Sequence, residues 1–375
     1  MNPAGPALSV LDNAAHGAAG EVEPWKRELQ QTIRSAEGLR AALELTDAEY
    51  SSAVRAEQQG FPIAVTPHYL SLIDGRDPSC PLRQQVVPGP EEGNPGRGDL
   101  RDPLGEEAHE VAPELIQRYP DRALLLVSDR CAVYCRFCTR SRMVGQGGGP
   151  RSVERLGPAF SYLAAHPEVR DVIVSGGDPL AMSTSRLVSI IERLRAIPSV
   201  ETIRLATRVP VVLPARITTE LLTALRPFHP LWVMTHFNHP REVDEQAGAA
   251  LERLADAGFP VMNQAVLLRG INDDAATLTR LFRALVRRRV RPYYLLQMDP
   301  VSGTSHLRTP VQTGIDIMEQ LQGRLSGIAL PKLIMDTPGG WGKIPLGPDY
   351  VLSRAEGVTR VRTPRGVTVD YFDPE

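Results

Sequence analysis

Cysteine is scarce in this sequence. Four of the 375 residues are cysteines, and three of them, Cys131, Cys135 and Cys138, lie close together, while Cys80 stands alone. So few cysteines in this arrangement do not form a disulfide framework, which excludes a small disulfide-stapled fold. Free thiols are typical of a reducing compartment, so we expect a cytoplasmic protein.

Lysine is also scarce, because all but three of the 42 basic residues are arginines. Lys26 falls in a predicted surface helix and Lys332 in a predicted strand, whereas Lys343 lies in a glycine-rich stretch. A reaction that needs a lysine amine therefore has three candidates, of which Lys343 is the best placed.

Long apolar runs and a dominant charge are missing as well. No stretch reaches the roughly 18 consecutive apolar residues that a membrane-spanning helix needs. A net charge of −2 gives no field that attracts nucleic acid or an anionic membrane, so we expect neither as a partner. Residues 1–23 lack the basic and apolar parts of a secretory signal, and we interpret them as a disordered tail.

Beyond the tail, the pattern of the sequence divides the chain into three parts. Residues 24–117 predict an N-terminal helical region and an irregular arm rich in glycine and proline at 88–105. Residues 118–330 alternate short apolar runs with amphipathic helical patterns. Residues 331–375 predict a lysine-bearing glycine-rich loop followed by short strands.

Six short runs rich in apolar, β-branched and aromatic residues give the central part its order. They are Ala123–Val127, Asp171–Val174, Thr202–Ala206, Leu231–Thr235, Val261–Val266 and Pro292–Leu296. Strands alternating with helices predict a parallel sheet, and six units are two short of a closed eight-fold barrel. We therefore expect an α/β fold, a partial (β/α)6 TIM-like barrel with an N-terminal helical region and a C-terminal β-containing extension.

The cysteine motif Cys131-x-x-x-Cys135-x-x-Cys138 begins just beyond the first of these runs. Three thiolates on one loop suit three irons of a [4Fe–4S] cluster and leave the fourth iron open to another ligand. A structural zinc site is the alternative, but it needs four ligands, and the nearest histidines are His109 and His166. We therefore predict a cluster. The spacing resembles that of the radical S-adenosylmethionine superfamily, in which the open iron binds S-adenosylmethionine.

A glycine pair follows the second run, in Ser175-Gly176-Gly177-Asp178. Adjacent glycines allow a backbone to approach a ligand closely, although such a sequence is also typical of a simple turn. Its place one strand–helix unit after the cysteine motif resembles the superfamily's glycine-rich stretch beside S-adenosylmethionine.

The second glycine-rich stretch, residues 338–343, ends at Lys343. It is not a phosphate-binding P-loop, because Thr337 replaces the first glycine and Ile344 follows the lysine. A surface turn with a solvated lysine is one interpretation. The other is a lysine that forms a Schiff base with a carbonyl cofactor, and the scarcity of lysine favours it.

Several polar residues follow or lie within the predicted strands, at the end where barrel enzymes hold their active sites. Each alone is more often a structural hydrogen-bonding residue than a ligand. They are Arg140, Arg208, His236, Gln264, Asp299 and Asp336. Arg118 and Arg122, just before the first strand, suit a phosphate group or an ion pair with acids.

Together these features resemble the lysine 2,3-aminomutase family. The resemblance runs from about residue 66 to about residue 350, over several blocks in the family's order. The blocks are Thr66–Asp74, Arg118–Arg122, Cys138–Arg140, Thr235–Pro240, Leu267–Asp273, His306–Pro310 and the Lys343 loop. The resemblance implies a partial barrel that uses a [4Fe–4S] cluster, S-adenosylmethionine and pyridoxal 5'-phosphate.

The resemblance also implies roles for individual residues. Lys343 is the catalytic residue that holds pyridoxal phosphate, and Arg118 and Arg122 contact the phosphate group. Contacts to S-adenosylmethionine are implied for Ser175, Gly176, Gly177, Asp178, His236 and Gln264.

For the substrate, the resemblance assigns the α-carboxylate to Arg140 and the far end of the side chain to Asp299 and Asp336. Two carboxylates in a closed site need a cation, or one of them takes up a proton. We therefore expect a cationic amino acid, L-lysine before L-arginine, whose α-amino group moves to C3. A glutamate enzyme would not place two acids there.

The sequence departs from the family in its zinc ligands. Clostridial-type members bind zinc through C-terminal cysteines and a cysteine of a partner subunit, whereas this chain has no cysteine after Cys138 and has Asp274 at the partner position. We therefore expect no zinc, and a homo-oligomer without the zinc-linked contact. Leu296 replaces an aromatic residue expected near the pyridoxal ring.

Other readings stay open. A lyase or oxidoreductase using the same cofactors, or a β-lysine-forming enzyme that serves elongation factor P, fits the same motifs, and a non-catalytic iron–sulfur protein fits them less well. The resemblance implies a reducing electron donor of the flavodoxin or ferredoxin type. The residues do not choose between lysine and arginine.

Overall fold

The computed structural model describes residues 23–94, 96–145 and 147–374. The tail predicted over 1–23 lies outside these residues, apart from Glu23, which pairs with Lys26. Helices open the described chain, as the sequence predicts. They are α1 (Pro24–Gln30), α2 (Ala36–Ala42), α3 (Asp47–Gln58) and α4 (Pro67–Ser71).

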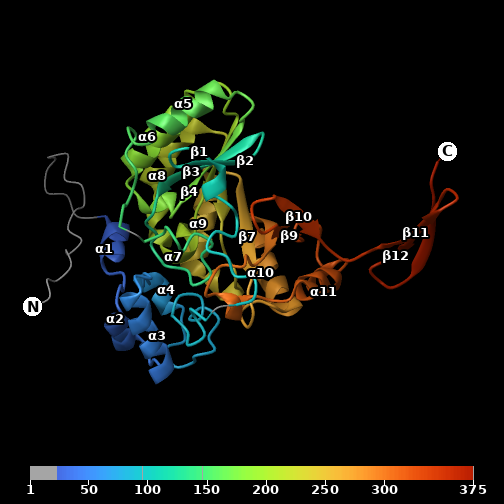
Figure 1. The fold of residues 1–375 in the computed structure, drawn as a ribbon, viewed down its shortest axis with the longest axis horizontal. Helices are drawn as coiled ribbons and strands as arrows, with labels where there is room; N and C mark the ends of the chain where they lie inside the picture. The colour runs from blue at the N-terminus through green and yellow to red at the C-terminus, as the bar shows by residue number, and fades with distance from the viewer. Residues whose placement is uncertain (1–22, 95, 146, 375) are drawn as a thin grey trace, which may run out of the picture.

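One ten-stranded sheet, in chain order from β1 to β10, forms the centre of the molecule (Figure 1). The strands are β1 (Glu110–Ala112), β2 (Leu115–Tyr119), β3 (Arg122–Ser128), β4 (Asp171–Gly176), β5 (Thr202–Ala206), β6 (Leu231–Thr235), β7 (Val261–Leu267), β8 (Arg291–Gln297), β9 (Lys332–Asp336) and β10 (Lys343–Leu346). Strands β3 to β9 are parallel, and β1, β2 and β10 are antiparallel.

The expected partial barrel is confirmed, since the six predicted runs are β3 to β8. Strand β9 adds a seventh parallel strand, which pairs with β8 through Tyr294–Lys332 and Leu296–Ile334. Its apolar run is short and leads directly into a glycine-rich loop. For that reason the sequence grouped it with the C-terminal extension rather than with the barrel.

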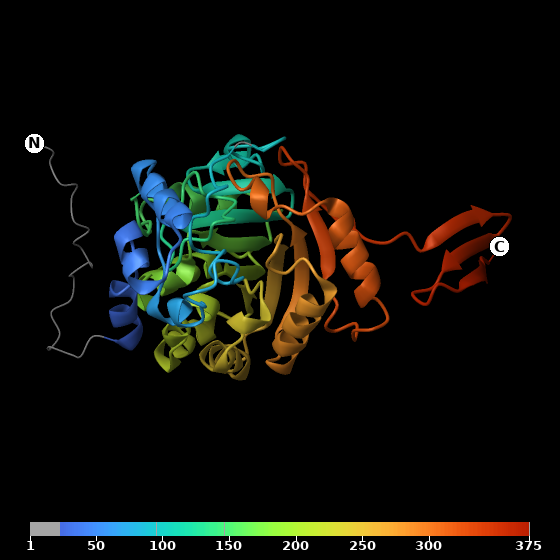
Figure 2. The same ribbon diagram turned by 90° about the horizontal axis from the view of Figure 1, so that it is seen from below.

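Helices connect the parallel strands and cover the outer face of the curved sheet (Figure 2). They are α5 (Gly157–Ala165), α6 (Thr184–Arg195), α7 (Val209–Val212), α8 (Thr219–Leu225), α9 (Glu245–Asp256), α10 (Ala275–Arg287) and α11 (Val311–Leu321). Six 3-10 turns are η1 (Glu107–His109), η2 (Pro179–Ala181), η3 (Pro214–Arg216), η4 (Arg226–Phe228), η5 (Pro240–Glu242) and η6 (Ser305–Leu307).

Helix α10 shows why these connections fold against the sheet. Leu278, Leu281, Phe282 and Leu285 are fully buried, and their spacing places them on one face of the helix. The helix begins after Asp274, whose carboxylate accepts a 2.8 Å hydrogen bond from the backbone N–H of the first turn. With one apolar face buried on the sheet, the loops at the carboxyl ends of the strands remain for function.

Three antiparallel strands form a separate C-terminal sheet, β11 (Val351–Ala355), β12 (Val358–Arg362) and β13 (Thr368–Phe372). It projects away from the barrel on a connecting segment (Figure 2). Every residue of β11 and β13 is exposed, including Tyr371 at 62% and Phe372 at 74%. Among the described residues, no helix is both long enough and apolar enough to cross a membrane.

Candidate active site

The carboxyl ends of the parallel strands hold most of the predicted site residues. Ser175 and Gly176 end β4, His236 follows β6 directly, Asp299 lies just after β8, and Asp336 ends β9. Neighbouring parallel strands end at the same edge of a sheet, so these residues lie along one rim of the barrel.

The loop that carries the cysteine motif is fixed by the N-terminal part of the chain. The Tyr134 N–H donates to the Ala64 carbonyl and the Arg136 N–H to the Gln85 carbonyl, each at 2.9 Å. The Arg136 side chain is buried and forms an ion pair with Glu92 of the arm. Contacts with the N-terminal part of the chain therefore help to set the path of the loop.

The three thiols of this loop affect one another electrostatically. Burial, Asp178 and the other two thiols raise the pKa of Cys131 well above its ordinary value. Burial and Cys135 raise the pKa of Cys138 to about 11. Since each thiolate opposes the ionisation of its neighbours, three thiolates are stable together only around a cationic centre. The donor set therefore fits an iron–sulfur cluster.

The arrangement of the thiols differs from that of a single-ion site. Within the described ranges, no three His, Cys, Asp or Glu side chains are placed to hold one metal ion. A [4Fe–4S] cluster does not need such convergence, because each thiolate binds a different iron.

The glycine pair at the end of β4 packs against the backbone that enters the cysteine motif. A Cβ on Gly177 would lie 2.2 Å from the Arg130 carbonyl oxygen, and one on Gly176 would lie 2.3 Å from the Ser128 carbonyl oxygen. Gly176 also has a φ of +112°. Close contact between the β4 loop and the backbone before the cysteine motif therefore requires glycine at both positions. The sequence alone does not indicate this packing role.

Gly177→Ala is expected to destabilise the fold by about 2 kcal/mol and to lower the iron bound per chain, because the new Cβ meets main-chain atoms that have no rotamer to change. Gly327→Ala is the control, since a Cβ there has no atom within 4 Å. Denaturant unfolding and iron content measure both variants. Equal stability of the two variants would contradict the steric argument.

The carboxylate of Asp178 is hydrogen-bonded to other residues of this chain. It accepts hydrogen bonds from the Thr207 hydroxyl at 2.7 Å, the Arg208 N–H at 2.7 Å and the Leu180 N–H at 2.9 Å. Burial nevertheless raises its pKa. These bonds join the glycine loop to the end of β5, so Asp178 shapes the loop.

His236 and Gln264 offer polar groups toward the interior of the barrel. Burial and the charge of Arg208 lower the pKa of His236 to about 3, so its imidazole is neutral at physiological pH. Its Nε2 is buried and has no hydrogen-bond partner within the described part of the chain. Gln264 lies in mid-β7, on the half-buried face of that strand. A buried nitrogen without a partner suits a bound ligand such as S-adenosylmethionine.

Lys343 opens β10 directly opposite Asp336, its register partner in β9. Its ammonium group forms an ion pair with the Asp336 carboxylate, and its backbone N–H donates to the Tyr119 hydroxyl at 2.8 Å. Arg118 binds the other oxygen of Asp336 at 3.2 Å. The glycine-rich loop is thus the hairpin turn that brings the lysine back to the rim. It rests on the arm, where a Cβ on Gly340 would lie 2.6 Å from a carbonyl oxygen.

The two predicted phosphate contacts both lie near one aromatic ring. The Arg122 guanidinium lies 4.1 Å from the centre of the Tyr119 ring, and the Arg118 guanidinium lies 5.8 Å from it. Tyr119 in turn bonds Lys343. The arginines, the aromatic ring and the amine therefore form one group, whose chemistry fits the phosphate and aldehyde ends of pyridoxal phosphate.

Asp299 faces Asp336 across this group. Its carboxylate accepts a 2.8 Å hydrogen bond from the Thr139 hydroxyl. Burial and the charge of Asp336 raise the pKa of Asp299 to about 6, against the opposing effects of Thr139 and the Lys343 ammonium. The two carboxylates are thus close enough to oppose each other's ionisation, which a bound cation would relieve.

Arg140 has a partner that the sequence did not predict. Its Nε and Nη2 bind the buried carboxylate of Glu106 at 2.9 and 2.7 Å, and Arg142 binds the other Glu106 oxygen at 2.9 Å. Burial acts to lower the pKa of Arg140, but Glu106 outweighs it and the pKa is raised. Glu106 lies just after the arm, directly before η1, where neither spacing nor a motif distinguishes it from its neighbours.

Comparison with known proteins places these features in a family. A family model described as the radical SAM superfamily matches residues 125–282, and one described as lysine-2,3-aminomutase matches residues 318–375. The first range contains the cysteine motif, and the second contains the Lys343 loop.

Curated relatives cover nearly the whole chain. The L-lysine 2,3-aminomutase of Fusobacterium nucleatum subsp. nucleatum is 46% identical over 95% of this chain and 83% of its own length. That of Clostridium subterminale is 45% identical over 93% of this chain and 84% of its own. A glutamate 2,3-aminomutase of Clostridioides difficile is 39% identical over 98% and 85%. Overall similarity therefore extends to relatives with substrates of opposite charge.

Proposed function

The chain belongs to the lysine 2,3-aminomutase family of radical S-adenosylmethionine enzymes, and on that basis we propose that it is an isomerase acting on a cationic L-amino acid. L-lysine is the proposed substrate and L-arginine the alternative, and the α-amino group moves to C3. The observation that carries the proposal is the pair of carboxylates, Asp299 and Asp336, beside the amine of Lys343.

The carboxylate pair argues for a cation because of its charge. Asp336 pairs with the Lys343 ammonium and Arg118, and Arg140 acts electrostatically on Asp299. We propose that Lys343 and Arg118 also serve a cofactor, and that Arg140 also serves the substrate carboxylate. Even with these cations present, the charge of Asp336 raises the pKa of Asp299, so the two carboxylates are not fully compensated. A substrate ammonium or guanidinium restores the balance, whereas the side-chain carboxylate of glutamate would add a third negative charge.

The cofactor proposed at Lys343 is pyridoxal 5'-phosphate. When bound, it would stabilise a substrate radical that side chains cannot. Arg118 and Arg122 hold its phosphate through guanidinium groups, and Tyr119 keeps the backbone of Lys343 in place. Asp336 orients the lysine amine and accepts a proton from it.

The proposed partner of the cluster is S-adenosylmethionine, whose cleavage starts radical chemistry. His236 offers a neutral nitrogen and Gln264 an amide, while Ser175, Gly176 and Gly177 supply the backbone of the β4 loop. Asp178 supports that loop. Arg140 binds the substrate α-carboxylate with donors left free by Glu106, which fixes the plane of the guanidinium.

The pH dependence of substrate binding follows from Asp299. As the pH falls through about 6, Asp299 takes up a proton and loses the charge that faces the substrate cation. The KM for L-lysine should therefore rise below about pH 6 and level off above it, and Asp299→Asn should remove this step. The ordinary pKa of this carboxyl group is 3.8. Between that value and about pH 6 the folded state binds the proton more tightly than the unfolded state, so Asp299 stabilises the folded state increasingly as the pH falls through this range.

Initial rates over a range of lysine concentrations from about pH 5 to about pH 8 measure this step in both proteins. Thr139→Val is the matched control, because it removes the hydrogen bond that favours the ionised form and should move the step to higher pH. A KM independent of pH in the unaltered enzyme would contradict the assignment of Asp299.

Product analysis separates the mutase from the alternatives with the same cofactors. Under anaerobic conditions, with a low-potential flavodoxin or ferredoxin as electron donor, a mutase gives a β-amino acid and regenerates S-adenosylmethionine. A lyase or an oxidoreductase would instead release ammonia or CO2, or form one 5'-deoxyadenosine for each product. Either of these results would overturn the proposed reaction.

We also propose that the enzyme is a homo-oligomer in a reducing cytoplasm. Three free clustered thiols support the location. The C-terminal sheet supports the assembly, because a three-stranded sheet with exposed Leu352, Tyr371 and Phe372 buries little apolar surface by itself. A second copy of the chain would cover it, and sedimentation of the full chain as a monomer would contradict this assignment.

A further inference from the structure

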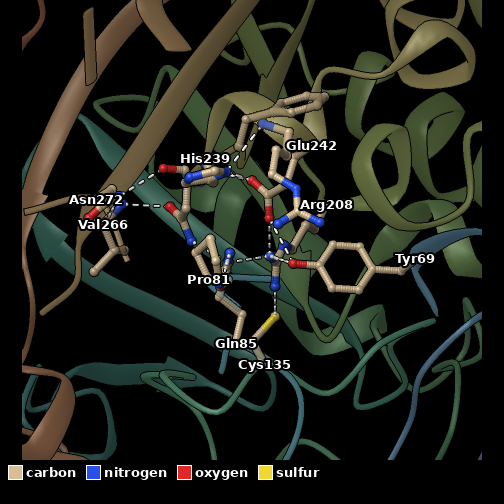
Figure 3. Close-up of polar contacts among 12 residues, drawn as sticks. Tyr69, Pro81, Gln85, Cys135, Arg208, His239, Glu242, Val266 and Asn272 are labelled. Atoms are coloured by element: carbon tan, nitrogen blue, oxygen red, sulfur yellow. Dashed lines mark hydrogen bonds and ion pairs between the residues drawn. The ribbon is translucent and has the colours of Figure 1, made fainter. Parts of the chain in front are cut away.

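A buried arginine links the cysteine motif to a carboxylate deep in the fold (Figure 3). Arg208 follows β5 and is 8% exposed, and its Nη1 lies 2.6 Å from the sulfur of Cys135. Its Nη2 binds Glu242 at 2.8 Å and Gln85 at 2.6 Å, and contacts the Tyr69 hydroxyl at 3.3 Å. Nη1 of the guanidinium therefore contacts a predicted cluster ligand, whereas Nη2 contacts buried side chains of the fold.

The partners of Arg208 hold it rigidly. Glu242 is fully buried and accepts hydrogen bonds from Tyr69 at 2.9 Å, from the Asn238 N–H at 2.6 Å and from the His239 N–H at 2.9 Å. Gln85 accepts from the Asn238 amide at 3.1 Å. Figure 3 shows Glu242 on the side of the guanidinium away from the Cys135 thiol, with Tyr69 and Gln85 on either side.

This arrangement has a direction. The positive group contacts the sulfur, and the negative group lies behind the positive one, so the buried pair is a dipole with its positive end on Cys135. Nothing in the reaction outlined above uses Arg208 or Glu242. A protein is often equally stable when a buried ion pair is replaced by apolar side chains of similar volume. Stability alone therefore does not account for the pair of Arg208 and Glu242.

We propose that Arg208 is a positioning residue that raises the reduction potential of the iron–sulfur cluster through Cys135, and that Glu242 limits this effect as its counter-charge. The proposal rests on the cluster of the family and not on pyridoxal phosphate or the identity of the amino acid. Reduction adds one electron to the cluster and makes it more negative. A cationic donor at a ligating sulfur therefore stabilises the reduced form more than the oxidised form.

The test compares the cluster's midpoint potential in four proteins after anaerobic reconstitution. They are the unaltered enzyme, Arg208→Gln, Glu242→Gln and the control Arg204→Gln. Arg204 lies in the middle of β5, four residues before Arg208, and pairs with Asp171 of β4, which is opposite the first residue of β5. Each sample is titrated at an electrode with mediators and followed by the electron paramagnetic resonance signal of the reduced cluster, with iron and sulfide measured per chain.

Arg208→Gln is expected to lower the equilibrium constant for reduction about tenfold or more, which is 59 mV per tenfold for one electron. Glu242→Gln is expected to move the potential in the opposite direction, because it leaves the positive charge uncompensated. Arg204→Gln should match the unaltered enzyme. Opposite signs for Arg208 and Glu242 distinguish a charge effect from structural damage, which would move both variants alike.

Three results would overturn the proposal. The first is an unchanged potential in Arg208→Gln with full iron content, and the second is a shift of the same sign in Glu242→Gln. The third is an equal shift in Arg204→Gln. If Arg208→Gln fails to hold iron, the direction of the potential shift in Glu242→Gln decides: a higher potential supports the proposal, and an unchanged or lower potential overturns it. A protein that holds no cluster in its unaltered form would instead contradict the family's cofactor at these cysteines.

Discussion

Lys343→Ala should abolish the visible absorbance of bound pyridoxal phosphate and lower turnover about 10³-fold or more, the scale on which enzymes lose a covalent catalytic group. The reason is local. Lys343 is the only lysine on the described rim of the barrel, and its amine lies on the carboxylate of Asp336 with Arg118 bound to the other oxygen. Alanine leaves Arg118 and Arg122, the proposed phosphate contacts, in place but offers no amine.

Lys332→Ala is the matched control, because Lys332 opens the adjacent strand β9 with its side chain exposed. It should keep the absorbance and the turnover of the unaltered enzyme. Absorbance spectra after adding pyridoxal phosphate, together with anaerobic turnover, measure both variants. Full absorbance in Lys343→Ala would show that the cofactor binds another amine. Loss of the absorbance in Lys332→Ala would show that the loss in Lys343→Ala is not specific to that lysine.

Cys138→Ala should remove the cluster and with it all cleavage of S-adenosylmethionine. Burial and Cys135 make the Cys138 thiol hard to ionise unless a cationic centre accepts it, and the described chain offers no fourth clustered cysteine to replace it. With one of three thiolates gone, the cluster loses a third of its protein ligands. We expect iron bound per chain to fall at least about fivefold and 5'-deoxyadenosine to be undetectable.

Cys80→Ala controls for the loss of a buried thiol. Cys80 is fully buried, and its sulfur accepts a 3.4 Å hydrogen bond from the Asp74 N–H, far along the chain from the motif. This variant should lose some stability but keep its iron. Iron and sulfide assays with product chromatography decide the matter, and normal iron content in Cys138→Ala would exclude that residue as a ligand.

The sequence predicts the barrel well because its order is local. Strands β5 and β6 match their predicted bounds at both ends, since each is an apolar run between polar turns. The short strands predicted after the glycine-rich loop are also present, as β11, β12 and β13. Strand β9 has the same apolar character, but only its pairing with β8 shows that it belongs to the parallel sheet.

Local sequence patterns do not predict contacts between residues that come together only in the folded structure. The place of Arg140 after the cysteine motif marks it as a candidate, yet Glu106, which binds it, lies between the arm and η1, in a stretch with no periodicity. Arg208 was recognised as a strand-end residue, but its contact with Cys135 depends on how two loops fold together. The predicted contact of Gly177 with S-adenosylmethionine stays a prediction, and the structure adds that packing against the Arg130 carbonyl also requires a glycine there.

We propose that the carboxylate pair selects a cationic amino acid. One anaerobic reaction of the reconstituted enzyme with equimolar L-lysine, L-arginine and L-glutamate tests it most directly, with products identified by nuclear magnetic resonance. Asp299 and Asp336 predict β-lysine as the main product, β-arginine as the only other, and no β-glutamate. Formation of β-glutamate in preference to both would contradict the account.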